Sequence, residues 1–164
     1  MELDSASIGM LIALVILVAF SAYFSATETA FTSLNRIRLK TKSDNGNRAA
    51  ARALAIAEEY DRMLTTILIG NNIVNITATT VATVLCTKWF HEYGPTVSTV
   101  ALTIIILIFG EVTPKSLAKE SPERFAMLSA PLLKVLMIVL TPLNIVFAGW
   151  KKLLSLVLHS GEAL

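Results

Sequence analysis

The stretch IFGEVTPKS, residues 108–116, decides the fold because it places a carboxylate and a helix breaker at the end of a long apolar run. Glu111 follows Gly110 directly and stands three residues before Pro114. The preceding run, VSTVALTIIILIFG, is apolar enough to lie in a lipid bilayer. A charge at bilayer depth costs from about 2.5 to well above 10 kcal/mol. Glu111 is therefore protonated, paired with a cationic side chain, or bound to a cation.

The composition is that of an integral membrane protein. Of the 164 residues, 54% are hydrophobic and 16% are charged, whereas a soluble domain carries about 25% charged residues. The formal net charge of +2 is too small to indicate binding to nucleic acid, and we expect no nucleic-acid partner. Cys86 is the only cysteine, which excludes an internal disulfide and a cysteine-rich metal site.

Three apolar stretches are long enough to cross about 30 Å of hydrocarbon, which takes about 20 helical residues. They cover residues 7–33, 63–89 and 97–118. Residues 36–62, between the first and second stretch, are rich in Arg and Lys and contain the turn signal SDNGN, which predicts a polar helical hairpin outside the lipid. We therefore predict an all-α integral membrane fold with three transmembrane helices in a single domain, residues 1–164.

The last segment, residues 123–159, allows two interpretations. Its length and apolar content fit a fourth span. However, Lys134 lies inside it, Pro131 and Pro142 interrupt it, and Trp150 is followed by two lysines, a pattern that fits a bent interfacial helix better. We favour a juxtamembrane helix and keep the fourth span as the alternative.

The basic hairpin also sets the expected orientation. Short loops rich in Lys and Arg stay in the cytoplasm, so residues 36–62 are expected there. The N-terminus is then outside, and with three spans the C-terminus is cytoplasmic. We expect a multi-pass protein of the plasma (inner) membrane.

Polar residues within the spans supply oxygen atoms that could balance Glu111. On the first span, three side chains recur on one helical face at spacings of four and three residues; on the second, two asparagines lie one turn apart with a third beside them. These residues are Ser21, Ser25 and Glu28 on the first span, and Asn71, Asn75 and Asn72 on the second.

Pro114 supplies a further oxygen. Proline lacks an N–H and clashes with the carbonyl four residues earlier, which is that of Gly110. Within a membrane, a released carbonyl is tolerated only where another group satisfies it. All of these are hard oxygen ligands, typical of Mg²⁺ or Ca²⁺ rather than Zn²⁺ or copper. Glu28 would balance the second charge of a divalent ion if it reached the site.

Each residue also has a structural interpretation. Ser21 and Ser25 could bond their own backbone, and Asn75 could make an interhelical hydrogen bond. Glu28 could cap its helix or pair with Arg36. Glu111 could pair with Lys115, one turn later.

Three motifs in this order resemble a known family. FSATETAFTSLN (24–35), IGNNIVN (69–75) and IFGEVTPKSLA (108–118) are similar to the transmembrane domain of the CorC/cyclin-M (CNNM) magnesium transporters. The resemblance implies a homodimer in the lipid bilayer, with three spans per protomer, a cytoplasmic helix pair after the first and a juxtamembrane belt helix after the third. It implies Mg²⁺ transport, as export coupled to Na⁺. It also implies that full-length members continue into cytoplasmic CBS domains that bind ATP; this chain is expected to be the membrane domain alone, without ATP regulation.

The resemblance also assigns the ion ligands. It places Mg²⁺, the transported substrate, on Ser21, Ser25, Asn75, the Gly110 carbonyl and Glu111. Asn71 and Asn72 are the other asparagines of the same motif. Glu28 would belong to a neighbouring Na⁺ or gating site.

These inferences lead to an ion carrier that is not an enzyme. The alternative is an ion-sensing membrane scaffold that binds a divalent cation without net flux. A third interpretation is a structural assembly subunit in which Glu111 pairs with Lys115 and binds no cation.

Overall fold

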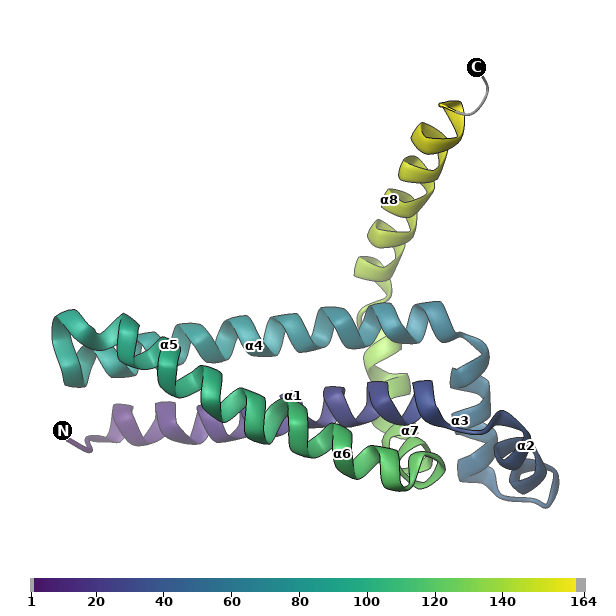
Figure 1. Ribbon diagram of the computed structural model, residues 1–164, viewed down its shortest axis with the longest axis horizontal. Helices are drawn as coiled ribbons and strands as arrows, with labels where there is room; N and C mark the ends of the chain where they lie inside the picture. Colours follow the sequence, from purple (N-terminus) through teal and green to yellow (C-terminus); the bar gives the residue numbers. More distant parts are fainter. Residues whose placement is uncertain (1, 162–164) are drawn as a thin grey trace.

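The computed structural model describes residues 2–161, and this part of the chain is helical almost throughout, without strands (Figure 1). The eight α-helices are separated by short turns, by one 3₁₀ turn, η1, and by one π-helical segment, η2. Their bounds are α1 (Ser5–Ser33), α2 (Arg36–Asp44), α3 (Arg48–Glu58), α4 (Tyr60–Phe90), η1 (His91–Tyr93), α5 (Gly94–Ile105), η2 (Ile106–Val112), α6 (Thr113–Glu120), α7 (Pro122–Val139) and α8 (Thr141–Ser160).

The helices begin where the sequence supplies start signals. Asp4, Asn35 and Asn47 each accept a hydrogen bond from a backbone N–H in the first turn of α1, α2 and α3. The helices α5, α7 and α8 instead have a proline in the first turn, where its missing N–H costs nothing. The helix α6 also has a proline in its first turn, Pro114, but it continues directly from η2.

Three long helical rods lie side by side: α1, α4, and the continuous rod from α5 through η2 to α6 (Figure 1). By length and composition, two helical segments could cross a membrane, Ser5–Ser33 and Tyr60–Glu120, and the bent pair α7–α8 would make a third. Tyr60–Glu120 folds back on itself at η1 (Figure 1), so that it supplies two of the three rods. The prediction of an all-helical fold with helices long and apolar enough to cross a membrane is confirmed for the described residues.

The outer faces of these segments are apolar and uncovered. Only 17% of the most apolar window of each candidate span is buried within the chain. Large hydrophobic side chains such as Ile12, Val15 and Ile76 are more than half exposed. A surface of this kind is stable only against lipid or another protein.

Small residues let the hairpin α2–α3 and helix α7 pack closely at one end of the rods. Ala50, Ala53, Ala126 and Ala130 are fully buried there, in one apolar cluster with Leu133. α7 runs across the rods rather than along them (Figure 1). Its position against α1 is fixed in part by the Tyr23 hydroxyl, which donates to the Ser129 carbonyl at 2.7 Å.

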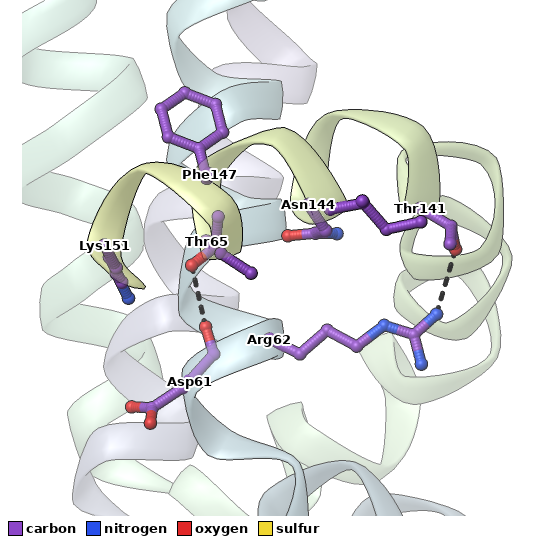
Figure 2. Close-up of a pocket in the computed structure, with 9 residues that line it drawn as sticks. Asp61, Arg62, Thr65, Thr141, Asn144, Phe147 and Lys151 are labelled. Carbon is purple, nitrogen blue, oxygen red and sulfur yellow. Dashed lines mark hydrogen bonds between the residues drawn. The ribbon is translucent and has the colours of Figure 1, made fainter. Parts of the chain in front are cut away.

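The segment predicted as one juxtamembrane helix, residues 123–159, consists of two helices that meet at an angle of 70°. Arg62 of α4 stabilises the bend, because its Nη2 donates to Thr141 Oγ1 at 3.0 Å (Figure 2) and to the Met137 carbonyl at 3.2 Å. Asn144 Nδ2 donates to Thr66 Oγ1 at 3.0 Å. No residue of α8 is buried within residues 2–161, and α8 points away from the rods (Figure 1).

At the other end of the rods, the start of α1 is held to the end of α4. Lys88 forms an ion pair with Asp4 and donates to Ser7 Oγ at 3.2 Å. The Lys88 ammonium holds the pKa of the Asp4 carboxyl well below its usual range, helped by the hydrogen bonds from Ser7. Trp89 Nε1 donates to the Glu2 carbonyl at 3.1 Å.

Candidate functional site

The site begins at the π-helical segment η2, which contains Gly110 and Glu111. The Thr113 N–H bonds to the carbonyl of Ile108, five residues earlier, instead of four. Pro114 follows and has no N–H to donate, whether to Gly110 in an α register or to Phe109 in a π register. The helix breaker therefore produces a widened turn, and π-helical turns of this kind occur frequently at functional sites.

Gly110 is the point where the third rod approaches α1. A Cβ added at this position would lie 2.9 Å from Ser21 Oγ, closer than real side chains come. Ser21 is fully buried. The glycine therefore brings the backbone of η2 against the serine face of α1.

Asn71 connects this contact to α4. Its Oδ1 accepts from Ser21 Oγ and from Asn75 Nδ2, both at 3.4 Å. These hydrogen bonds are long, near the limit of useful strength. The structure thus brings together four of the predicted residues, Ser21, Asn71, Asn75 and Gly110, from three rods.

Two oxygen atoms of the predicted ligand set are buried without a hydrogen-bond partner in the described residues: Ser25 Oγ and Asn75 Oδ1. Ser25 lies one turn along α1 from Ser21 and is 1% exposed. An unsatisfied buried polar group costs about 1–3 kcal/mol, and native proteins rarely retain one without a reason. The donor set consists of hard oxygens, so the residues fit Mg²⁺ as a bound substrate.

Glu111 is close to this cluster and is also paired. Its Oε2 lies 3.2 Å from Lys115 Nζ, with 27% of the glutamate side chain and 41% of the lysine side chain exposed. Glu111 lines a cavity of about 390 Å³ together with Asn75. The ion pair is the arrangement that the third interpretation of the sequence expected, and it places the only carboxylate of the cluster beside a competing cation.

Two of the predicted residues lie elsewhere. Asn72 is exposed, donates from Nδ2 to the Leu68 carbonyl at 2.9 Å, and lines a separate cavity with Phe147 of α8. Glu28 is half-buried, one turn beyond Ser25. Its expected partner Arg36 donates instead to the Ala57 carbonyl at 2.7 Å.

Sequence reasoning missed the threonines that share the cavity with Glu111. Thr79 of α4, and Thr99 and Thr103 of α5, line it. Their signal in the sequence is polar residues four apart, Asn75 and Thr79, then Thr99 and Thr103, within apolar runs. In the described part of the chain, no three His, Cys, Asp or Glu residues cluster as metal ligands, so neutral oxygens would supply most of any cation site.

Comparison with known proteins identifies the family to which the chain is similar. The model of the cyclin M transmembrane N-terminal domain (CNNM) matches residues 11–162. The UPF0053 inner membrane protein YfjD of Escherichia coli K12 is 41% identical over 123 residues, which cover 75% of this chain and 29% of that protein. A UPF0053 protein of Haemophilus influenzae is 38% identical over 142 residues, 86% of this chain and 34% of that protein. A chloroplastic DUF21 domain-containing protein of Arabidopsis thaliana is 32% identical over 131 residues, 80% and 20% of the two chains. The chain spans about a third or less of the length of these relatives.

Proposed function

The chain belongs to the cyclin M transmembrane domain family, whose membrane domains are linked to divalent cation transport, and from this premise we propose that it carries Mg²⁺ across the membrane. The transport is export coupled to entry of Na⁺. The observation that carries the proposal is that two oxygens, Ser25 Oγ and Asn75 Oδ1, are buried without a partner in the described residues. Each belongs to a residue one helical turn from the contact between Ser21 and Asn71. In this proposal, one bound cation satisfies both oxygens.

The proposed membrane arrangement has three spans: α1, α4 and the rod α5–η2–α6. Their lengths support it, and so does the turn at η1, which makes α4 and α5 antiparallel (Figure 1). The basic hairpin α2–α3 lies in the cytoplasm, the N-terminus lies outside, and α7 and α8 form a bent belt on the cytoplasmic surface of the plasma (inner) membrane. α8 supports this belt because it is apolar, carries Lys151 and Lys152, and leaves the rods sideways.

The protein acts as a homodimer, and full-length members of the family join it to CBS domains. The exposed apolar surface of the rods provides area for a second copy as well as for lipid. No covalent chemistry is required, since a carrier only has to bind, enclose and release its ion.

Each residue of the cluster has a distinct role in this proposal. Ser21, Ser25 and Asn75 replace water molecules of the ion with neutral oxygens, and the Gly110 backbone supplies a carbonyl. Asn71 holds Ser21 and Asn75 in place through its Oδ1. Glu111 provides the negative charge, and Lys115 neutralises it between transport events, at 3.2 Å. Arrival of Mg²⁺ displaces the ammonium group.

The test is Mg²⁺ efflux from proteoliposomes that contain a Mg²⁺-sensitive dye, with and without a Na⁺ gradient. We expect Glu111→Gln and Asn75→Ala to lower the rate at least tenfold. Asn72→Ala is the matched control, because Asn72 belongs to the same motif but faces the other cavity. Wild-type rates for Glu111→Gln, or equal losses for Asn72→Ala and Asn75→Ala, would refute the assignment.

A second candidate function has one observation in its favour. The ion pair between Glu111 and Lys115 satisfies the carboxylate without any cation, as expected for a structural subunit. A sensing scaffold would in contrast bind Mg²⁺ without moving it. Calorimetric titration with Mg²⁺ separates the structural subunit from the others, and the flux assay separates the scaffold from the carrier.

A further inference from the structure

A groove with both polar and apolar side chains in its lining continues from Glu111 along the interface of α4 and α5. The cavity of about 390 Å³ is lined by Asn75 and Thr79 of α4 and by Thr99, Thr103 and Glu111 of the third rod. Apolar side chains of the third rod complete its walls. Its polar side chains lie among exposed aliphatic side chains of the same helices.

The oxygens of this groove are left as acceptors. A threonine hydroxyl has one hydrogen and two lone pairs. Thr79 donates its hydrogen to the Asn75 carbonyl at 2.9 Å and Thr99 to the Pro95 carbonyl at 2.8 Å, and Thr103 donates in the same way to the Thr99 carbonyl. The lone pairs remain available, so the hydroxyls offer acceptors to the groove.

The other polar side chains of the groove, Asn75 and Glu111, also offer hydrogen-bond acceptors. Asn75 donates from Nδ2 to Asn71, while its Oδ1 has no partner in the described residues. Glu111 contributes a carboxylate. No basic side chain lines the groove along residues 2–161, and Lys115 meets Glu111 from outside this lining. The polar atoms of this lining, acceptors and one carboxylate, therefore favour a cation over an anion.

The groove leads away from the basic hairpin. Thr103 and Thr99 precede Glu111 by eight and twelve residues, which correspond to about 12 and 18 Å along a helix. Both lie toward η1, the end of the rods that carries the N-terminus (Figure 1). Thr83 and Ser98 are hydrogen-bonded at 3.1 Å in the same direction and join α4 to α5 beyond the groove.

We propose that this groove is the route by which a hard cation passes between the Glu111 site and the outer surface of the membrane. The threonine oxygens replace part of the water shell of the ion, which keeps its remaining water molecules. The inference rests on the proposed function and extends its site outward. Departing Mg²⁺ and entering Na⁺ share the required chemistry, and the experiment below distinguishes them.

Threonines in membrane helices commonly donate hydrogen bonds to their own backbone, and this hydrogen bond alone does not identify an ion route. Thr77 and Thr80 of α4 show it too, donating to the carbonyls four residues earlier at 2.6 and 3.0 Å. Both are exposed and lie outside the groove. They therefore provide matched controls on the same helix.

The first experiment measures access from outside. In a Cys86→Ala background, Thr99→Cys, Thr103→Cys and the control Thr77→Cys are exposed in spheroplasts to membrane-impermeant cationic and anionic methanethiosulfonates. We expect the cationic reagent to modify positions 99 and 103 at least tenfold faster than the anionic one, and position 77 to stay unmodified. Protection by Mg²⁺ or by Na⁺ identifies the ion. Unreactive cysteines, equal rates for both reagents, or protection by neither ion would overturn the proposal.

The second experiment measures flux. Thr79→Val/Thr103→Val keeps the shape of the side chains and removes two oxygens, as does the control Thr77→Val/Thr80→Val. We expect the first pair to lower Mg²⁺ flux at least fivefold with unchanged calorimetric Mg²⁺ affinity, and the control pair to leave both unchanged. Equal flux for the two pairs overturns the groove. If the wild type shows no flux, the proposed function is overturned instead. The cysteine modification rates then still test, independently of flux, whether cations enter the groove.

Discussion

Removing Lys115 tests directly whether Glu111 is an ion ligand or one half of a structural ion pair. The two side chains lie 3.2 Å apart on neighbouring turns, and both are partly exposed. If Mg²⁺ binds Glu111, the ion must displace the Lys115 ammonium, so the ion pair opposes binding. Lys115→Gln then tightens Mg²⁺ binding. If the pair is structural, the same change only destabilises the protein.

The magnitude follows from the geometry. Two unit charges at this distance attract each other by about 5 kcal/mol at an effective dielectric constant of about 20. Desolvation and the loss of side-chain freedom cancel most of this, and exposed pairs contribute about 0.2–1 kcal/mol net. With 27% and 41% of the side chains exposed, we take the upper value, about 1 kcal/mol. This corresponds to an approximately fivefold lower Kd for Mg²⁺.

The assay is calorimetric titration of the purified protein with Mg²⁺, accompanied by thermal unfolding with and without the ion. Lys119→Gln is the control, since Lys119 is exposed one turn farther along α6 and makes no ion pair within residues 2–161. It corrects for the general loss of one positive charge. An unchanged or weaker affinity for Lys115→Gln, together with a lower unfolding temperature, would show that Glu111 serves the fold and would refute its role as a ligand.

Three further predictions address the packing around the site and the ends of the rods. Gly110→Ala places a Cβ 2.9 Å from Ser21 Oγ, so the serine must turn away; we expect at least tenfold weaker calorimetric Mg²⁺ binding and a nearly unchanged unfolding temperature. Gly70→Ala drives a Cβ into the buried Phe24 ring, and overpacking of this kind costs about 1–3 kcal/mol; the unfolding temperature should fall, and the second change Phe24→Leu should restore part of it. Because the pKa of Asp4 is lowered in the folded protein, its ionised carboxylate stabilises the fold above the pKa of the unfolded carboxyl, about 3.9, and this stability is lost as pH falls below that value; Asp4→Asn should flatten the decline in unfolding temperature below about pH 4.

The sequence predicts the helices well because their signals are local. Twenty or more apolar residues, a cap such as Asn35 or Asn47, and a proline in the first turn are each read without knowledge of the tertiary structure. Pro142 marks the break between α7 and α8 in the sequence, but the contacts that hold the bend come from a distant helix. Arg62 reaches the Met137 carbonyl across 75 positions of the chain, and no pattern in residues 123–159 reveals such a partner.

The sequence predicted the residue types of the candidate site better than it predicted which of these residues contact one another. Ser21, Asn71, Asn75 and Gly110 stand out because they are polar or small in apolar runs, and the structure brings them together. Asn72 has the same residue type and differs from Asn71 only by one helical step of about 100°. That step turns it to another cavity, a distinction that requires the packing of α4 against its neighbours.

The π-helical segment explains why the threonines escaped the sequence analysis. Residues four apart in an α-helix drift by about 40° per step, so Thr99 and Glu111, three such steps apart, would differ by about 120°. The wider turn of η2 takes more residues per turn and reduces this drift between Thr103 and Glu111. As a result, Thr99, Thr103 and Glu111 line one cavity. Pro114 marks the break in the sequence, and its consequence is a change in helical phase: Glu111 lines the same cavity as the threonines while its Oε2 also pairs with Lys115 of its own rod.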